Sequence, residues 1–129
     1  MLELKITVVV TALFAIMIVP LVSQITMRRI QLGNVAIGDA NDFDLRKKIE
    51  TLSNFCEYVP LGLIILALLE LNYAHENYAL VFGVLFLAAR ILHALGMLYV
   101  KAPLPRAIAM LIQHISFLAA AGMLLKSVL

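Results

Sequence analysis

Residues 53–71 read SNFCEYVPLGLIILALLEL, and this stretch decides the class of fold. From Val59 onward it is almost entirely aliphatic, as in a helix that crosses a membrane. The residues before Val59 place Asn54, Glu57 and Tyr58 in the same uninterrupted segment. Ionisable residues inside a membrane-spanning helix are costly and mark a functional site by default. The stretch therefore predicts a membrane helix that carries a polar site in one half.

The composition of the whole chain agrees with that stretch. Hydrophobic residues make up 64% of the 129 residues, and the mean hydropathy is +1.02. A soluble domain is only about 45–50% apolar, so we predict an integral membrane protein. The length fits a single domain, residues 1–129. The net charge is only +2 and no basic run is present, so nucleic-acid binding is not expected.

Four segments are apolar and long enough to span a membrane. We predict spans at residues 4–27, 46–71, 78–100 and 105–128. Short loops rich in Gly, Asn, Asp and Pro connect them, which is typical of turns. The predicted fold is all-α, an integral membrane four-helix bundle.

Positive charge is concentrated on one side of these spans. Seven Lys or Arg residues flank the first and third loops and two lie on the opposite side: Arg28, Arg29, Arg46, Lys47, Lys48, Lys101 and Arg106, against Lys5 and Lys126. Cytoplasmic loops of membrane proteins are enriched in Lys and Arg. We therefore expect loops one and three in the cytoplasm and both termini outside.

Polar residues follow one face of the second span. The spacing is four, four and three along Arg46, Glu50, Asn54 and Glu57, so they share a helical face. The third span contains Arg90, which has no charged partner in its own span. A bare Arg in hydrocarbon is costly, so we predict that Glu57 pairs with Arg90 and that a cavity surrounds them. A pair that only locks two helices together is the simpler alternative.

Other polar residues of the spans are assigned structural roles. Glu70, near the end of the second span, is expected to be solvated at the membrane interface. Gln113 and His114 are expected to form hydrogen bonds between helices. Cys56 lies about 100° round the helix from Glu57 and is expected to be a packed thiol. The His residues do not have metal-ligand spacing with any Cys or Asp, so no metal site is predicted.

Two segments together resemble the MAPEG family, the membrane-associated proteins of eicosanoid and glutathione metabolism. They are NFCEYVP at residues 54–60 and RILHALG at residues 90–96. The segment RRIQLGNVAIGD at residues 28–39 is similar to bacterial members. The resemblance covers nearly the whole chain. It implies a homotrimer in a bacterial inner membrane, with a glutathione site between subunits that opens to the cytoplasm.

The resemblance also implies which residues act. Those expected to bind glutathione are Arg28, Arg29, Asn54, Glu57, Tyr58, Arg90 and His93. Arg90 and Arg106 are expected to be catalytic, because a nearby Arg favours the thiolate form of a thiol. The expected function is a glutathione-dependent transferase or peroxidase. Its substrates would be hydrophobic electrophiles or lipid hydroperoxides that enter from the membrane lipids.

Four positions depart from the family pattern. Glu50 stands where many relatives have Arg, Leu52 where His or Gln is common, Met97 where Tyr is common, and Leu104 where an activating Arg is found. These departures favour one alternative, a non-catalytic lipid- or partner-binding protein on the same scaffold. A second alternative is a small four-span transporter. Such transporters usually place a carboxylate in the first span, and here no charge lies between Lys5 and Arg28.

Overall fold

The structure, a computed structural model of the chain, describes residues 4–129. It contains four α-helices: α1, Lys5–Gln31; α2, Phe43–Asn72; α3, Tyr78–Tyr99; and α4, Leu104–Lys126. Across residues 4–129 there is no β-strand. Each helix is long and apolar enough to cross a membrane. The predicted all-α membrane fold with four spanning helices is therefore confirmed.

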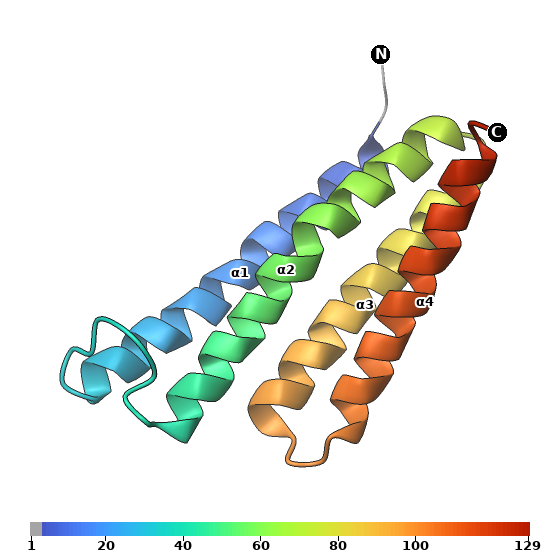
Figure 1. Cartoon of the computed structure of the whole chain (residues 1–129). Coiled ribbons are helices and arrows are strands. Elements are labelled where there is room, and N and C mark those ends of the chain that lie inside the picture. Colours follow the sequence, from blue (N-terminus) through green and yellow to red (C-terminus); the bar gives the residue numbers. More distant parts are fainter. Residues whose placement is uncertain (1–3) are drawn as a thin grey trace.

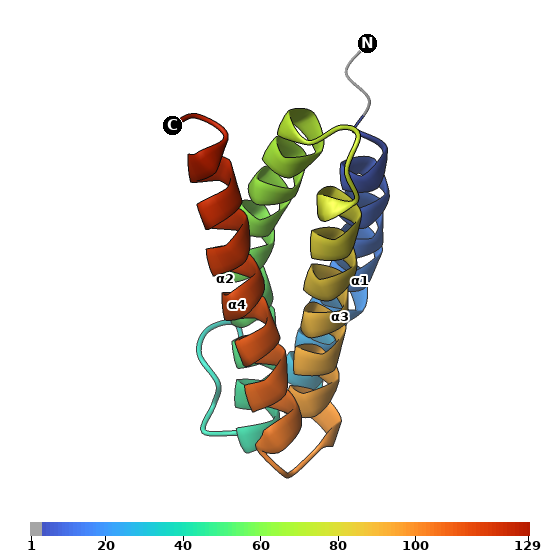
Figure 2. The ribbon, with the colours of Figure 1, turned by 90° about the vertical axis from the view of Figure 1, so that its right-hand side faces the viewer.

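The helices alternate in direction, so that the chain has two distinct ends (Figure 1). Loops 32–42 and 100–103 lie together at one end, which we call the loop end. The 73–77 connection and the C-terminus lie at the other, which we call the terminal end. Helices α2 and α3 form the centre, with α1 and α4 on either side of them (Figure 2). Within the described chain, α1 and α4 each contact α2 and α3 but not one another.

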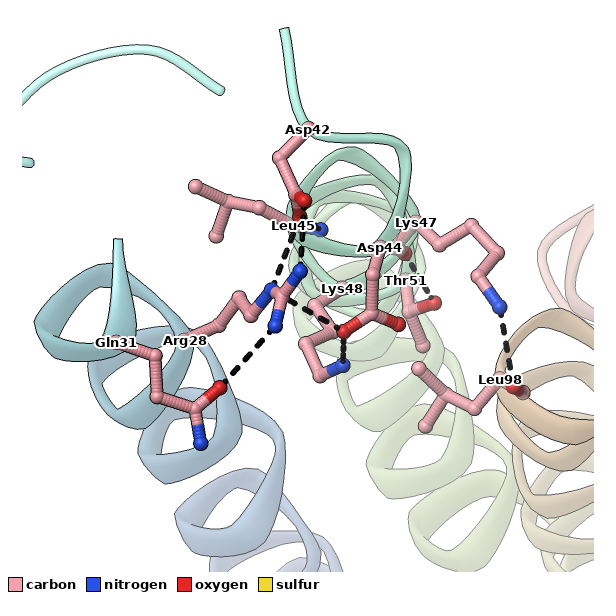
Figure 3. Close-up of polar contacts among 9 residues, drawn as sticks. All are labelled: Arg28, Gln31, Asp42, Asp44, Leu45, Lys47, Lys48, Thr51 and Leu98. Carbon is pink, nitrogen blue, oxygen red and sulfur yellow. Dashed lines mark hydrogen bonds and ion pairs between the residues drawn. The ribbon is translucent and has the colours of Figure 1, made fainter. Parts of the chain in front are cut away.

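Helix α2 begins at Phe43, three residues before the predicted start, because Asp42 caps it. The Asp42 carboxylate accepts a 2.7 Å hydrogen bond from the Leu45 amide, which satisfies one of the free N–H groups of the first turn. Arg28 at the end of α1 donates to the same carboxylate at 3.1 and 2.7 Å (Figure 3). The Arg28 hydrogen bond and then the Leu45 amide lower the pKa of Asp42 to about 2. The first loop is thus tied to both helices that it connects.

Phenylalanines from all four helices build the core. Phe14 packs edge-on against Phe55 and Phe86, with ring centroids 5.7 and 4.9 Å apart. Phe86 is fully buried, and its ring lies directly on the backbone of Gly62. A Cβ at Gly62 would lie 2.1 Å from Cζ of Phe86, so only glycine fits here. This contact sets how closely α2 and α3 approach in the middle of the membrane.

Glu70 is not the solvated interfacial residue predicted from the sequence. It is 8% exposed, and its carboxylate lies at the start of α1. It accepts hydrogen bonds from the Ile6 amide at 2.7 Å, the Thr7 amide at 2.8 Å and the Thr7 hydroxyl at 2.7 Å. No side chain of α1 itself caps that terminus. The prediction was wrong because the first-turn N–H groups of another helix, which attract negative charge, supply the partners.

Candidate functional site

The candidate site is centred on Arg90, which α3 places inside the bundle. Only 2% of this side chain is exposed. Its Nη1 donates a 2.6 Å hydrogen bond to Oδ1 of Asn54, and its Nη2 contacts Sδ of Met110 at 3.6 Å. Its Nε has no partner among residues 4–129, and no carboxylate of those residues forms an ion pair with it. Arg90 is thus a buried cation held by neutral groups.

Tyr58 closes one side of this site. Its ring lies over the Arg90 guanidinium, with Cζ 4.9 Å from the ring centroid, which is a favourable cation–π arrangement. Its hydroxyl lies 3.1 Å from Nε2 of His114 on α4. Asn54, Tyr58, Arg90 and His114 therefore form a polar layer that joins α2, α3 and α4 in the membrane interior. The predicted hydrogen bond of His114 to another helix is confirmed.

The predicted pairing of Glu57 with Arg90 is wrong for this chain. Glu57 is exposed, and its partner is Ser53 Oγ at 3.2 Å, one turn back on α2. Successive α-helical residues are about 100° apart, so Glu57 points about 60° to one side of Asn54 and about 100° away from Tyr58. Because Asn54 and Tyr58 face Arg90, the Glu57 side chain is turned outward. Cys56, predicted to be a packed thiol, is likewise exposed.

His93 and Arg106 extend the site toward the loop end. His93 is 7% exposed and lies within electrostatic range of both Arg90 and Arg106. Arg106 is half-buried, and its Nη1 contacts Sδ of Met97 at 3.3 Å. A Cβ on Gly96 would lie 3.1 Å from Cγ of Arg106, so this glycine lets the start of α4 pack closely on α3. The close packing brings Arg106 to the same side of α3 as His93.

Arg28 and Arg29 lie at the loop end and are engaged within their own chain. Arg28 binds Asp42, as described above. The Arg29 guanidinium donates to the backbone carbonyls of Ala36 and Gly38 in the first loop. Neither contacts the residues around Arg90 in the contacts of residues 4–129. The expectation that one of them reaches glutathione from a neighbouring subunit stays a prediction.

Sequence reasoning missed two features of α4 in this layer. Met110 supplies the sulfur that contacts both Arg90 and, at 4.0 Å, the Asn54 amide. Gln113 is fully buried, but neither end of its amide has a hydrogen-bond partner in the part of the chain that the structure describes. Its predicted interhelical bond is therefore absent there. The spacing of Met110, Gln113 and His114 by three and one, which is one helical face, was the available signal.

The chemistry of this layer suits an anion rather than a metal. Among the described residues, no three His, Cys, Asp or Glu side chains gather as metal ligands would. A buried guanidinium with a free N–H favours a carboxylate or a thiolate as its partner. Within residues 4–129, the exposed carboxylates of α2, Glu50 and Glu57, form no ion pair with it.

Comparison with known proteins identifies the family. The profile of the MAPEG family matches residues 6–126, nearly the whole chain. The chain belongs to the MAPEG family. This MAPEG protein is also similar to the inner membrane protein YecN of Escherichia coli strains K12 and O6:H1. Each is 28% identical over 90 residues, which cover 67% of this chain and 69% of YecN. No solved structure matches it significantly.

Membership of the MAPEG family was predicted from two short motifs, and that prediction is confirmed. The structure adds that the two motifs meet. Asn54 of the first is hydrogen-bonded to Arg90 of the second, and Tyr58 of the first lies over the same guanidinium. Three residues of the family pattern, Asn54, Tyr58 and Arg90, thus lie in the polar layer, whereas Glu57 of the first motif does not.

Proposed function

We propose that this protein is a membrane-bound glutathione-dependent transferase or peroxidase that acts on hydrophobic electrophiles or lipid hydroperoxides. One observation carries the proposal, the buried Arg90 that has no anionic partner among the described residues. Removing a charge from water costs several kcal/mol by order of magnitude unless a partner offsets it. Asn54 and the Tyr58 ring offset part of that cost. An anionic ligand would offset the rest.

The described residues fit glutathione in part. Asn54, Tyr58 and His93 surround Arg90 and would bind the tripeptide with it, and Glu57 would accept from its amino group. Arg28 or Arg29 of a neighbouring subunit would bind a carboxylate. Glu50 does not fit, because it places a negative charge where many relatives have an Arg. Binding would then rely more strongly on the remaining cations.

The chemistry supplied by bound glutathione is that of its thiol, a nucleophile and two-electron reductant once ionised. A free thiol has a pKa of about 8.5, and nearby cations lower it. Each pKa unit corresponds to about 1.4 kcal/mol of preference for the thiolate. In this protein Arg90 and Arg106 would supply that preference from a site largely closed to water.

We also propose a homotrimer, on the evidence of one face of α2. Arg46, Glu50, Ser53 and Glu57 are all exposed and spaced by four, three and four. This spacing places them on one face of the helix. Exposed carboxylates in a spanning helix are costly in lipid, so a second copy would cover them. A purified protein that is monomeric in mild detergent by light scattering would contradict this part of the proposal.

The membrane and the orientation belong to the same proposal. YecN is named as an inner membrane protein, and the same location is proposed for this chain in a bacterial cell. The excess of Lys and Arg at the loop end would place that end in the cytoplasm and both termini outside. The glutathione site would then open to the cytoplasm, where Arg106 lies. Hydrophobic substrates would enter from the bilayer.

A non-catalytic lipid- or partner-binding protein is the second candidate function. The observation that favours it is the loss of family side chains at Glu50, Met97 and Leu104. Such a protein would keep the polar layer of Asn54 and Arg90 as a structural element. It would bind no glutathione at millimolar concentration.

A glutathione titration of the detergent-purified protein separates the two candidates. Calorimetry reports binding, and ultraviolet absorbance reports the thiolate. The enzyme proposal expects binding with a thiolate signal. Arg106→Gln should weaken that signal, whereas the matched Lys126→Gln at the terminal end should leave it unchanged. Glu50→Arg should strengthen binding. Absence of both binding and thiolate in the wild type and in Glu50→Arg would reject the enzyme proposal.

A further inference from the structure

A basic pocket opens at the loop end, between the start of α2, the end of α3 and the start of α4. Its volume is about 420 Å³. Three cationic side chains line it, namely Lys47, Lys101 and Arg106. The other lining residues are apolar or aromatic, and none is a carboxylate. Arg90 does not line this pocket, whereas Arg106 does, so the pocket adjoins the candidate site at its loop end.

The cations of the pocket are positioned without being neutralised. Lys47 Nζ reaches across from α2 and donates to the carbonyl of Leu98 at 3.3 Å, at the end of α3 (Figure 3). It also lies 5.8 Å from the ring centroid of Phe43. Among the described residues, the Arg106 guanidinium has one polar contact, to the sulfur of Met97. None of the three cations forms an ion pair within residues 4–129. The pocket therefore carries uncompensated positive charge.

The pocket lies where the helices leave the apolar part of the bundle. Helix α3 ends at Tyr99 and α4 begins at Leu104. Phe43 and Tyr99, which line the pocket, are 73% and 76% exposed. Tyr side chains, with an apolar ring and a polar hydroxyl, are enriched at the boundary between membrane and water. A ligand that matches both the cations of the pocket and the apolar residues beside it has an anionic head and an apolar tail.

We propose that this pocket binds the phosphate headgroup of an anionic phospholipid. Lys and Arg donate strong, charge-assisted hydrogen bonds to phosphate oxygens. Basic pockets between spanning helices recognise anionic headgroups in this way. The acyl chains would lie along the exposed apolar residues next to the pocket, among them Leu104. The inference goes beyond the proposed glutathione chemistry but shares Arg106 with it, so competition with glutathione is part of the test.

The test is native mass spectrometry of the detergent-purified, full-length protein. The probes are phosphatidylglycerol and phosphatidylcholine with identical acyl chains. The proposal expects phosphatidylglycerol to be retained preferentially. Lys47→Gln and Lys101→Gln should each weaken its binding about fivefold, the effect of one surface charge near a lipid headgroup. The matched control Lys126→Gln, which removes a lysine at the terminal end, should leave it unchanged.

Several results would overturn the proposal. Equal retention of the two lipids would mean that the headgroup charge is not recognised. An equal effect of Lys126→Gln would assign the preference to overall charge. Displacement of the lipid by millimolar inorganic phosphate would indicate a site for a soluble anion. Displacement by glutathione would assign the pocket to the glutathione site. Should Lys47→Gln unfold the protein, Lys101→Gln, whose side chain is exposed, still tests the proposal.

Discussion

Glu70 offers the sharpest test of how the bundle is held together. Its carboxylate accepts three hydrogen bonds from the first turn of α1, at 2.7 to 2.8 Å. Glu70→Ala removes these bonds and leaves the Ile6 and Thr7 amides without a side-chain acceptor. Helix α1 would then remain attached to α2 mainly through the phenylalanine core and the Asp42 contact.

The size of the effect follows from these contacts. A hydrogen bond to a charged group contributes about 1.5–3 kcal/mol, but bonds that share one acceptor group do not add. Loss of a single N-cap costs about 0.5–2 kcal/mol. Glu70→Ala leaves two amides and one hydroxyl without their acceptor, and we expect it to lower the free energy of unfolding by about 3 kcal/mol. In a chain of this size that lowers the melting temperature by roughly 10 °C.

Thermal unfolding in detergent measures the total loss, and amide hydrogen exchange locates it. Exchange at Ile6 and Thr7 should accelerate, while the first turn of α4 should be unaffected. Glu76→Ala is the matched control, because Glu76 is an exposed carboxylate in the connection at the same end. If Glu70→Ala melts within about 2 °C of wild type and the exchange of these amides is unchanged, the carboxylate does not cap α1, and the reasoning fails.

Three further predictions follow from other contacts. Gly62→Ala should cost about 1–3 kcal/mol in thermal unfolding, because its Cβ would overlap the Phe86 ring, and an additional Phe86→Leu should restore part of the loss. The pKa of Asp42 is about 2 in the folded protein, compared with the ordinary value of 3.8. Its contribution to stability should therefore be complete above about pH 4 and be lost as the pH falls toward 2; Asp42→Asn should show a smaller loss of melting temperature over that range. Tyr58→Phe should cost about 0.5–1.5 kcal/mol through the bond to His114, and an equal melting temperature would show that this bond contributes nothing.

The membrane fold was predictable because its signal is local. About 20 apolar residues in a row can be placed only in a membrane, and the charges that flank them separate one span from the next. The four helices overlap the four predicted segments for this reason. The helix ends were less predictable. Helix α2 starts early because Asp42 caps it, and α1 continues through Arg28 to Gln31.

The residues of the polar layer were also visible in the sequence, but not their partners. Asn54, Tyr58 and Arg90 stood out because polar groups are rare inside a span. Their contacts with Met110 and His114 were not evident, since α4 carries no motif that points to α2 or α3. We predicted Glu57 as the partner of Arg90 because a buried cation is usually paired with an anion. In the structure, the amide of Asn54 and the ring of Tyr58 contact Arg90 instead.

The sequence by itself thus determined the number of membrane helices, the family, and which side chains are too polar to face lipid. Only the tertiary structure decided which of those side chains face one another. Glu57 and Asn54 differ by about 60° around α2, and both are compatible with the same sequence pattern. The rotation of α2 is set by packing, where Phe86 fits only over Gly62 and Glu70 fits the start of α1. That rotation turns Asn54 to Arg90 and leaves Glu57 on the outer surface.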